Sequence, residues 1–155
     1  FQTSKEYYEK GIWGFERNRL WPSWVGWGKV ALARSKVMNK EKGVDLESLY
    51  TRSRNNKPKV AEGWIQRYIG EILLNIDDQH LSEAAHWVQQ AIEADQRNGM
   101  MFHLGHDYAL YAELFKRKGD RLKGRENLGK AIELFKECGA DGWVEKYEKE
   151  LATLS

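Results

Sequence analysis

Two histidines that lie three residues apart, His103 and His106, form the pattern in this sequence that comes closest to a metal site. On a helix this spacing places both imidazoles on one face, where they could ligate a zinc ion. A zinc site needs more ligands, yet no glutamate stands between the two histidines, no third ligand has an obvious spacing, and no cysteine is near. The sequence therefore predicts neither a bound metal nor a cofactor.

The other reactive residue types are equally isolated. Cys138 is the one cysteine, so it can form no intramolecular disulfide, and its expected place near a helix C-terminus does not activate a thiolate. Asp77 and Asp78 fall at a turn, where aspartate is common for local reasons. The glycine-rich motifs of phosphate-binding loops, dinucleotide sites and hydrolase nucleophiles are missing. No nucleophile, base and oxyanion site come together, so we expect that the protein is not an enzyme and has no catalytic residue.

The charge of the chain argues against nucleic acid and membrane as partners. The 25 basic and 23 acidic residues nearly cancel, to a net charge of +2, whereas nucleic-acid binders need a strongly basic face. The one basic cluster, at 116–125, is explained by a solvated turn between helices, and an RNA-binding helical repeat is the less favoured alternative. No apolar run reaches the length of a membrane span, and no signal peptide is visible. Together with the single cysteine, these features predict a cytoplasmic protein.

The apolar residues recur at intervals of three and four, which is typical of helices that bury one face. Leu128, Ala131, Ile132 and Phe135 form one such stripe, and no segment alternates clearly enough to predict a strand. We therefore expect an all-α fold of about eight helices. They are predicted near residues 4–19, 22–39, 45–55, 59–76, 82–97, 100–118, 121–138 and 141–153.

Helix boundaries are indicated by residues with a known preference for helix ends. Pro22 suits the first turn of the second helix, and Gly119 followed by Asp120 ends one helix and begins the next. Gly139 closes the helix before residue 141 in the same way. The polar segment 52–58 ends on a proline and is predicted to be the longest loop.

A repeat of about 42 residues runs through these helices. The string Trp24-x-x-Trp27-Gly28-x-x-Ala31 places a small residue between large ones. The same spacing recurs 42 residues later in 66–73, with Gly70 at the small position, and again in 108–115, with Ala112 there. A small residue at a helix crossing lets two backbones approach each other, and a two-helix unit must stack on its neighbours to bury its apolar face.

These strings resemble the opening of the first helix in tetratricopeptide (TPR) repeats, and the segment 130–140 resembles TPR arrays in the C-terminal parts of bacterial multidomain signalling proteins. The resemblance covers nearly the whole chain, although the period exceeds the usual one. It implies a single TPR-like domain over 1–155, a right-handed α-solenoid of stacked antiparallel helix pairs. Its parts would be a partial repeat at 4–20, repeats at 22–56, 57–98 and 100–139, and a capping helix at 141–153. We expect the chain to be a fragment of a longer signalling protein.

In TPR arrays the first helix of each repeat lines a concave groove that holds a protein or peptide ligand. The resemblance therefore implies a scaffold or regulatory module for protein–protein interaction, with groove positions that mix apolar, charged and amide side chains. These positions are Lys29, Leu32, Trp64, Arg67, Glu71, Asn75, His106, Glu113 and Arg117.

Tryptophans are concentrated near the N-terminal end of the chain, where Trp21, Trp24 and Trp27 lie within seven residues. One interpretation is that these side chains pack at the first joint between repeats. The alternative is an exposed apolar patch that a missing N-terminal repeat or a second copy of the chain would cover. In the second case the protein would be a self-association module and a homodimer.

Overall fold

The computed structural model describes residues 1–18 and 22–154, and these ranges contain helices and connecting turns but no strand. The prediction of an all-α fold with eight helices is confirmed for the described residues. Most predicted ends lie within one or two residues of the observed ones. The elements are α1 (Gln2–Arg17), α2 (Pro22–Met38), α3 (Leu46–Arg54), the short 3-10 turn η1 (Lys59–Ala61), α4 (Glu62–Ile76), a second 3-10 turn η2 (Asp78–His80), α5 (Leu81–Arg97), α6 (Met101–Arg117), α7 (Arg121–Glu137) and α8 (Asp141–Thr153).

The helix ends follow the local signals of the sequence. Asp120 precedes α7, and its side chain accepts a hydrogen bond of 3.0 Å from the backbone N–H of Lys123. Gly119 and Gly139, with φ of 80° and 65°, adopt the left-handed conformation that glycine tolerates after a helix. Asp45 caps α3 through the backbone N–H of Ser48. Because these signals are local, they predict helix ends without knowledge of the fold.

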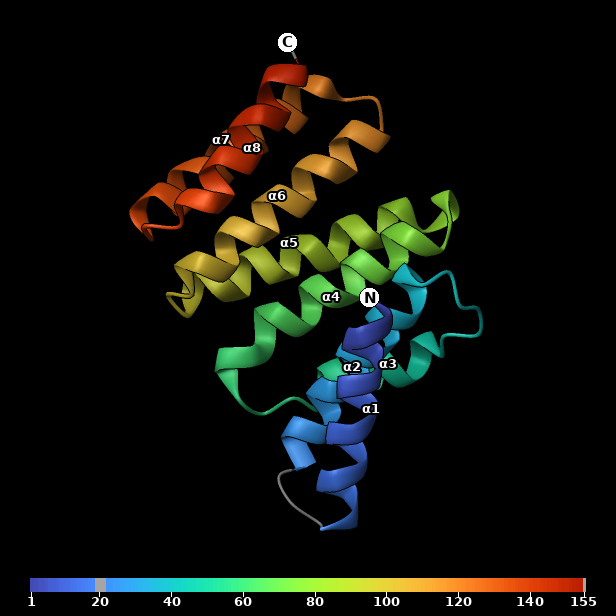
Figure 1. Cartoon of the computed structure of the whole chain (residues 1–155). Coiled ribbons are helices and arrows are strands. Elements are labelled where there is room, and N and C mark those ends of the chain that lie inside the picture. The colour runs from blue at the N-terminus through green and yellow to red at the C-terminus, as the bar shows by residue number, and fades with distance from the viewer. Residues whose placement is uncertain (19–21, 155) are drawn as a thin grey trace.

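The helices follow one another from α1 and α2, in the lower part of Figure 1, to α7 and α8 at its top, and the N-terminus lies near the middle of the picture, where α1 begins. Helix α4 packs along α5 and helix α6 along α7, so that 57–98 and 100–139 each form a helix pair. Helix α8 packs on α7 and ends the array. No described helix is both long and apolar enough to cross a membrane.

The pairing expected within 22–56 differs from the one observed. Helix α2 packs chiefly on α1 and α4, and its contact with the short helix α3 is slight. The reason is that the two glycines face different neighbours. A Cβ on Gly28 would meet Ile12 of the preceding helix, α1, at 3.0 Å, whereas a Cβ on Gly70 would meet Val88 of the following helix, α5, at 2.7 Å. Helix α3 has only nine residues and buries one of them, Leu49, so it offers little surface for pairing.

Helix α4 lies at the centre of the molecule and positions the site. It buries eight of its fifteen residues, among them Ile65, Ile69, Ile72 and Leu73, against neighbouring helices on several sides. It contacts α2, α3, α5 and α6. Because α4 is fixed on several sides, the side chains that project from it keep a constant position relative to α1, α2 and α6.

Candidate binding site

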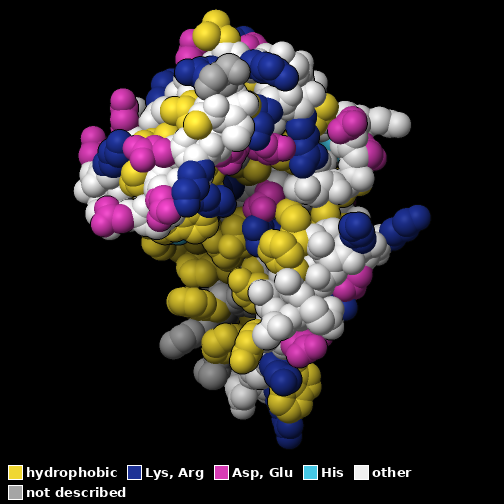
Figure 2. Space-filling model, turned by 45° about the horizontal axis from the view of Figure 1, so that its top comes forward, with side chains coloured by type: hydrophobic (Ala, Val, Ile, Leu, Met, Phe, Trp, Pro, Cys, Tyr) yellow, Lys and Arg dark blue, Asp and Glu magenta, His cyan; other side chains and the backbone are white. Residues whose placement is uncertain are grey.

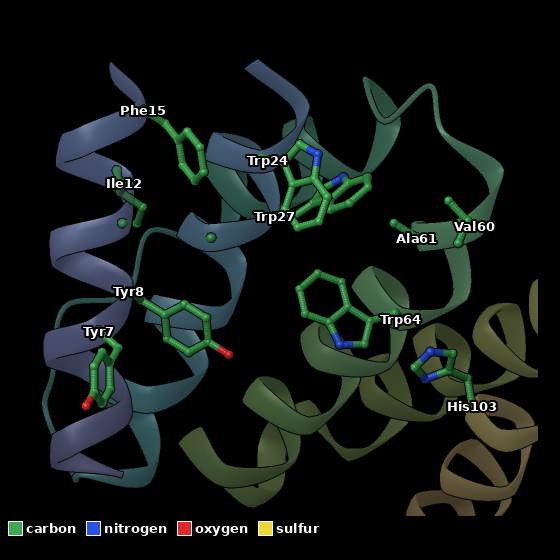
Figure 3. Close-up of a pocket in the computed structure, with 12 residues that line it drawn as sticks. Tyr7, Tyr8, Ile12, Phe15, Trp24, Trp27, Val60, Ala61, Trp64 and His103 are labelled. Atoms are coloured by element: carbon green, nitrogen blue, oxygen red, sulfur yellow. The ribbon is translucent and has the colours of Figure 1, made fainter. Parts of the chain in front are cut away.

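An aromatic hollow lies where α1, α2, η1, α4 and α6 meet. It has a volume of about 420 Å³, which falls in the range of ligand-binding pockets, and it is open to solvent on one side. Figure 3 shows the rings that surround it, and Figure 2 shows hydrophobic side chains gathered in the recess between the C-terminal and N-terminal helices. Six aromatic rings line it: Tyr7, Tyr8, Phe15, Trp24, Trp27 and Trp64.

Glycines and a fixed tryptophan shape this hollow. Gly11 and Gly28 lie in its wall; a Cβ on Gly11 would meet nothing within 4 Å, which leaves open space there, whereas the space at Gly28 is filled by Ile12. The indole N–H of Trp27 donates a hydrogen bond of 2.9 Å to Oδ1 of Asn56, whose own amide donates to the carbonyl of Pro58. The loop before η1 therefore holds the ring of Trp27 in place. Its centroid lies 6.4 Å from that of Trp64, with the two planes at 69°.

The rim of the aromatic hollow exposes apolar surface to water. The side chains of Tyr7, Trp24 and Val60 are 72%, 52% and 56% exposed. Large apolar side chains are usually scattered singly over a protein surface, whereas here three of them border one recess. Apolar surface gathered around a recess is typical of a binding site.

His103 forms one wall of the aromatic hollow, opposite α1 (Figure 3). Burial and the nearby guanidinium of Arg67 lower the pKa of His103, so its ring is neutral at pH 7. Nη2 of Arg67 lies 3.5 Å from Nδ1 of this ring. Because arginine can only donate, we assign Nδ1 as the acceptor, which leaves the proton on Nε2. The neutral histidine is thus a hydrogen-bond donor at the wall of an otherwise apolar hollow.

Behind His103 lies a buried cluster of Arg67 from α4, Asp95 from α5 and Asp107 from α6. Nη1 of Arg67 donates to Oδ1 of Asp107 at 3.0 Å and to the carbonyl of His103 at 3.1 Å. Both aspartates are fully buried, and three of their carboxyl oxygens receive no hydrogen bond. Burial raises the pKa of both aspartates, and a proton held between them supplies one of the missing donors.

A second, charged hollow of about 480 Å³ lies between α2, α4, α6 and α8. Arg34 and Glu71 face each other across α2 and α4 in a double hydrogen bond, with both N–O distances at 2.6 Å. The guanidinium of Arg34 also lies 4.8 Å from the ring centroid of Tyr68. Opposite charges that are this well paired leave little net charge, so the charged hollow offers directed hydrogen bonds rather than a strong field.

His106 closes the far wall of the charged hollow among aromatic rings. Its ring centroid lies 4.9 Å from that of Phe135 and 4.5 Å from that of Trp143. Burial, together with the charge of Arg67, lowers its pKa to about 4, so the ring stays neutral at physiological pH. His103 and His106 therefore serve different walls, and no group of three His, Cys, Asp or Glu side chains in 1–18 and 22–154 is arranged to hold a metal ion.

Five of the nine predicted groove residues lie at these two hollows. Trp64 lines the aromatic hollow, and four others line the charged one: Arg67, Glu71, His106 and Glu113. Arg67 is only 7% exposed and its guanidinium is held by buried partners, so it supports the walls rather than reaching for a ligand.

The other four predicted residues line neither of the two hollows. Lys29 and Leu32 border a separate hollow between α2 and α3, and Lys29 forms an ion pair with Glu16 of α1. Arg117 donates to the carbonyl of Leu74 and contacts Asn75 at the far end of α4. These four positions follow from the repeat pattern, but Lys29 and Leu32 lie toward α3, and Asn75 and Arg117 meet at the end of α4, outside both hollows.

Sequence reasoning missed the contribution of α1. Counting groove positions from the small residue of each repeat leaves out the first helix, yet Tyr7, Tyr8 and Phe15 come from it. The available signal was the spacing of Tyr8, Ile12 and Phe15, which places the three side chains on one face of a helix. Trp21, part of the predicted tryptophan-rich end, lies outside the described residues.

In comparisons with known proteins, no family model, no curated protein and no solved structure matches this chain. The resemblance to TPR repeats therefore remains an interpretation of the sequence pattern. What the chain itself establishes is an all-helical fold of paired helices with two adjoining hollows, one aromatic and one charged.

Proposed function

We propose that this chain is a non-catalytic TPR-like solenoid module whose two hollows together bind a segment of another protein. The observation that carries the proposal is the aromatic hollow, in which six rings and the donor of His103 surround open, uncharged space. Binding energy at protein interfaces is concentrated in a few aromatic anchors that fill such pockets. The resemblance of 130–140 to arrays in signalling proteins favours a role as a scaffold within a larger cytoplasmic protein.

The two hollows are close enough to serve one ligand. The ring of Trp64, in the aromatic hollow, lies 4.6 Å from that of Tyr68, in the charged hollow, and both residues belong to α4. A segment that places an apolar side chain among the rings can then meet Arg34 and Glu71 with its polar groups. Apolar anchors flanked by charge-assisted hydrogen bonds are a common mode of peptide recognition.

Trp64→Ala is expected to weaken the binding of peptides selected against the intact chain from a random displayed library by tenfold or more. Removing an aromatic anchor from the centre of an interface costs about 2 kcal/mol or more. The affinity is measured by titration calorimetry, and the helix content by circular dichroism, which should stay unchanged. Trp13→Ala is the matched control, because this tryptophan is 61% exposed and lies outside the lining of the hollow. Equal affinities of the two variants would refute the proposed site.

Self-association is the second candidate function, and a specific observation favours it. Trp13 is 61% exposed and Trp24 is 52% exposed, which is apolar surface that a second copy could cover. The peptide-binding proposal predicts that light scattering gives the mass of one chain, 18.1 kDa, across micromolar concentrations. A mass that rises with concentration in the parent but not in Trp24→Ala would instead make self-association the leading function.

A further inference from the structure

We infer that the aromatic hollow takes an uncharged aromatic side chain of the bound segment, an indole or a phenol ring, as its anchor. The inference rests on the proposed function and names the chemistry that the hollow selects. It draws on four observations: the charge of the walls, the orientation of the rings, the hydrogen-bond donor of His103, and the way the hollow opens into its neighbour.

The walls exclude a charged anchor. No acidic or basic side chain lines the hollow apart from His103, which is neutral. Aromatic cages that hold ammonium groups depend on ring faces and gain from a nearby acid. The charged group next to the wall, the guanidinium of Arg67, lies 3.5 Å from the ring nitrogen of His103 and is paired with Asp107. A cation in the hollow would lose its water without a carboxylate in the walls to replace it, and a carboxylate would lose its water without a cationic partner there.

The rings favour an aromatic side chain over an aliphatic one. The planes of Trp27 and Trp64 meet at 69° in an edge-to-face arrangement, and Trp24 is tilted by 45° against Trp27 at 4.9 Å. Figure 3 shows that Tyr8 approaches from the opposite side, from α1. A flat ring placed among them meets one face and one edge at the same time, the arrangement that aromatic pairs prefer. An aliphatic side chain would bury area but gain nothing from these orientations.

His103 gives the anchor an orientation. Its Nε2–H is the donor on the wall formed by α6, since Nδ1 faces Arg67. A tyrosine hydroxyl or a backbone carbonyl can accept from it, whereas the side chain of phenylalanine or leucine cannot. The indole N–H of tryptophan can only donate, so a tryptophan anchor uses this donor through a backbone carbonyl, whereas a tyrosine anchor can also use its hydroxyl.

The anchor belongs to a peptide rather than to a free small molecule because the hollow continues into the charged one. Tyr8 is close enough to Tyr68 and Arg34 for both to affect its pKa, which burial raises. The boundary between the hollows is thus formed by Tyr8, Trp64 and Tyr68, with Arg34 stacked on the last of these. A chain can cross this boundary and use the donors and acceptors beyond it, whereas a compact molecule cannot.

The test uses four probes against the intact chain: N-acetyl-tryptophanamide, N-acetyl-leucinamide, the N-acetyl amide of trimethyllysine, and free indole. Two-dimensional NMR of the tryptophan indole N–H groups, with the signal of Trp64 identified from Trp64→Phe, reports binding in the hollow. We expect tryptophanamide to bind with Kd on the order of 0.1 mM, as its size allows. Leucinamide and free indole should bind at least tenfold more weakly, and trimethyllysine should leave the Trp64 signal unmoved.

Variants of two histidines test the donor. His103→Ala should weaken the binding of tryptophanamide about fivefold, the effect of one hydrogen bond lost by a carbonyl of the probe. His86→Ala is the control, because this histidine is exposed on α5, away from the hollow. If His103→Ala fails to fold, the order of the four probes on the parent still decides the inference.

Several results would overturn the inference. Tighter binding of trimethyllysine would make the hollow a cation cage, and equal binding of leucinamide would make it a general apolar groove. Free indole that binds as tightly as tryptophanamide would identify a small molecule as the occupant. If no probe moves the Trp64 signal while selected peptides still depend on Trp64, the anchor is wrong and the proposed function stands. If tryptophanamide binds in the hollow but the affinity of the selected peptides does not depend on Trp64, the hollow accepts an aromatic ring and the proposed function is wrong.

Discussion

Replacing Gly63 by alanine is expected to lower the free energy of unfolding by about 3 kcal/mol or more, since overpacking and a damaged buried polar cluster act together. A Cβ at this position would lie 2.1 Å from Oδ1 of Asp95 and 2.3 Å from its Cγ. Asp95 is fully buried between α4 and α6 and cannot swing out to solvent. Either the carboxyl leaves Asp107, or α4 moves away from α5. Urea denaturation followed by circular dichroism measures the loss.

Two further variants distinguish this clash from a general effect of replacing a helical glycine by alanine. Gly129 lies inside α7, and a Cβ there would meet nothing within 4 Å, so Gly129→Ala should keep or raise stability by up to about 1 kcal/mol. In a chain that already carries Asp95→Ala, the additional cost of Gly63→Ala should fall to below about 1 kcal/mol, because the obstructing carboxyl is gone. A Gly63→Ala protein as stable as the parent would contradict the close approach of α4 and α5.

The helices could be predicted from the sequence because their causes are local. Helix α7 begins at a cap, Asp120, ends before a glycine of left-handed conformation, Gly139, and buries Leu128, Ala131 and Phe135 at helical spacing. Each of these signals acts within a few residues, whatever the rest of the chain does. Helix α6 has no side-chain cap, but it also ends before a glycine of left-handed conformation, Gly119, and the observed bounds of both helices differ from the expected ones by one residue or less.

The pairing of α2 could not be predicted in the same way. The repeat pattern treats Gly28 and Gly70 as equivalent, since both stand between large residues at the same spacing. A small residue shows that a partner comes close but not which one, and Gly28 faces Ile12 of the preceding helix instead of the following one. This difference brings α1 beside α2, and it is what supplies Tyr7, Tyr8 and Phe15 to the aromatic hollow.

The burial of the charged residues Arg67, Asp95 and Asp107 could not be predicted from the sequence either. Asp95 and Asp107 lie twelve residues apart on two helices, and each reads as an ordinary charge on a helix surface. Arg67 follows the repeat spacing and was predicted to face a ligand, yet it faces Asp107 inside the protein. Burial of a charge depends on which helices surround it, and the local spacing of residue types does not contain that information. The strongest electrostatic feature of the molecule is therefore visible only in the structure.

The buried pair of Asp95 and Asp107 leads to the last prediction. The free energy of unfolding should fall as the pH rises above the value at which an ordinary aspartate titrates, about 4. Burial raises the pKa of Asp107 to about 8, with Arg67 acting against it and Asp95 adding to it. Glu62 of α4 further raises the pKa of Asp95. The pair thus keeps one proton that the unfolded chain releases near pH 4. The two carboxyls share this proton, and Arg67, whose Nη1 lies 3.0 Å from Oδ1 of Asp107, stabilises the one negative charge that remains.

A group whose pKa is raised by folding stabilises the folded state at low pH and loses that contribution as the pH rises towards the raised value. The parent should therefore lose stability steadily between about pH 4 and pH 8, by about 1.4 kcal/mol for each unit of pKa shift. Asp95→Asn should abolish most of this slope. The amide cannot titrate, it occupies the same space, and its Nδ2 can donate to Oδ2 of Asp107 in place of the shared proton.

The measurement is the urea midpoint of parent and variant at a series of pH values from 5 to 8.5. The urea midpoint of Asp95→Asn relative to that of the parent should rise with each step in pH, and the difference should be largest near pH 8. Asp120→Asn is the control, because this exposed aspartate caps α7, a task that asparagine performs equally well, and its profile should run parallel to that of the parent. A parent whose stability is constant over this range would show that the pair does not hold a proton. Two buried carboxylates beside one arginine would then leave a net negative charge in the core.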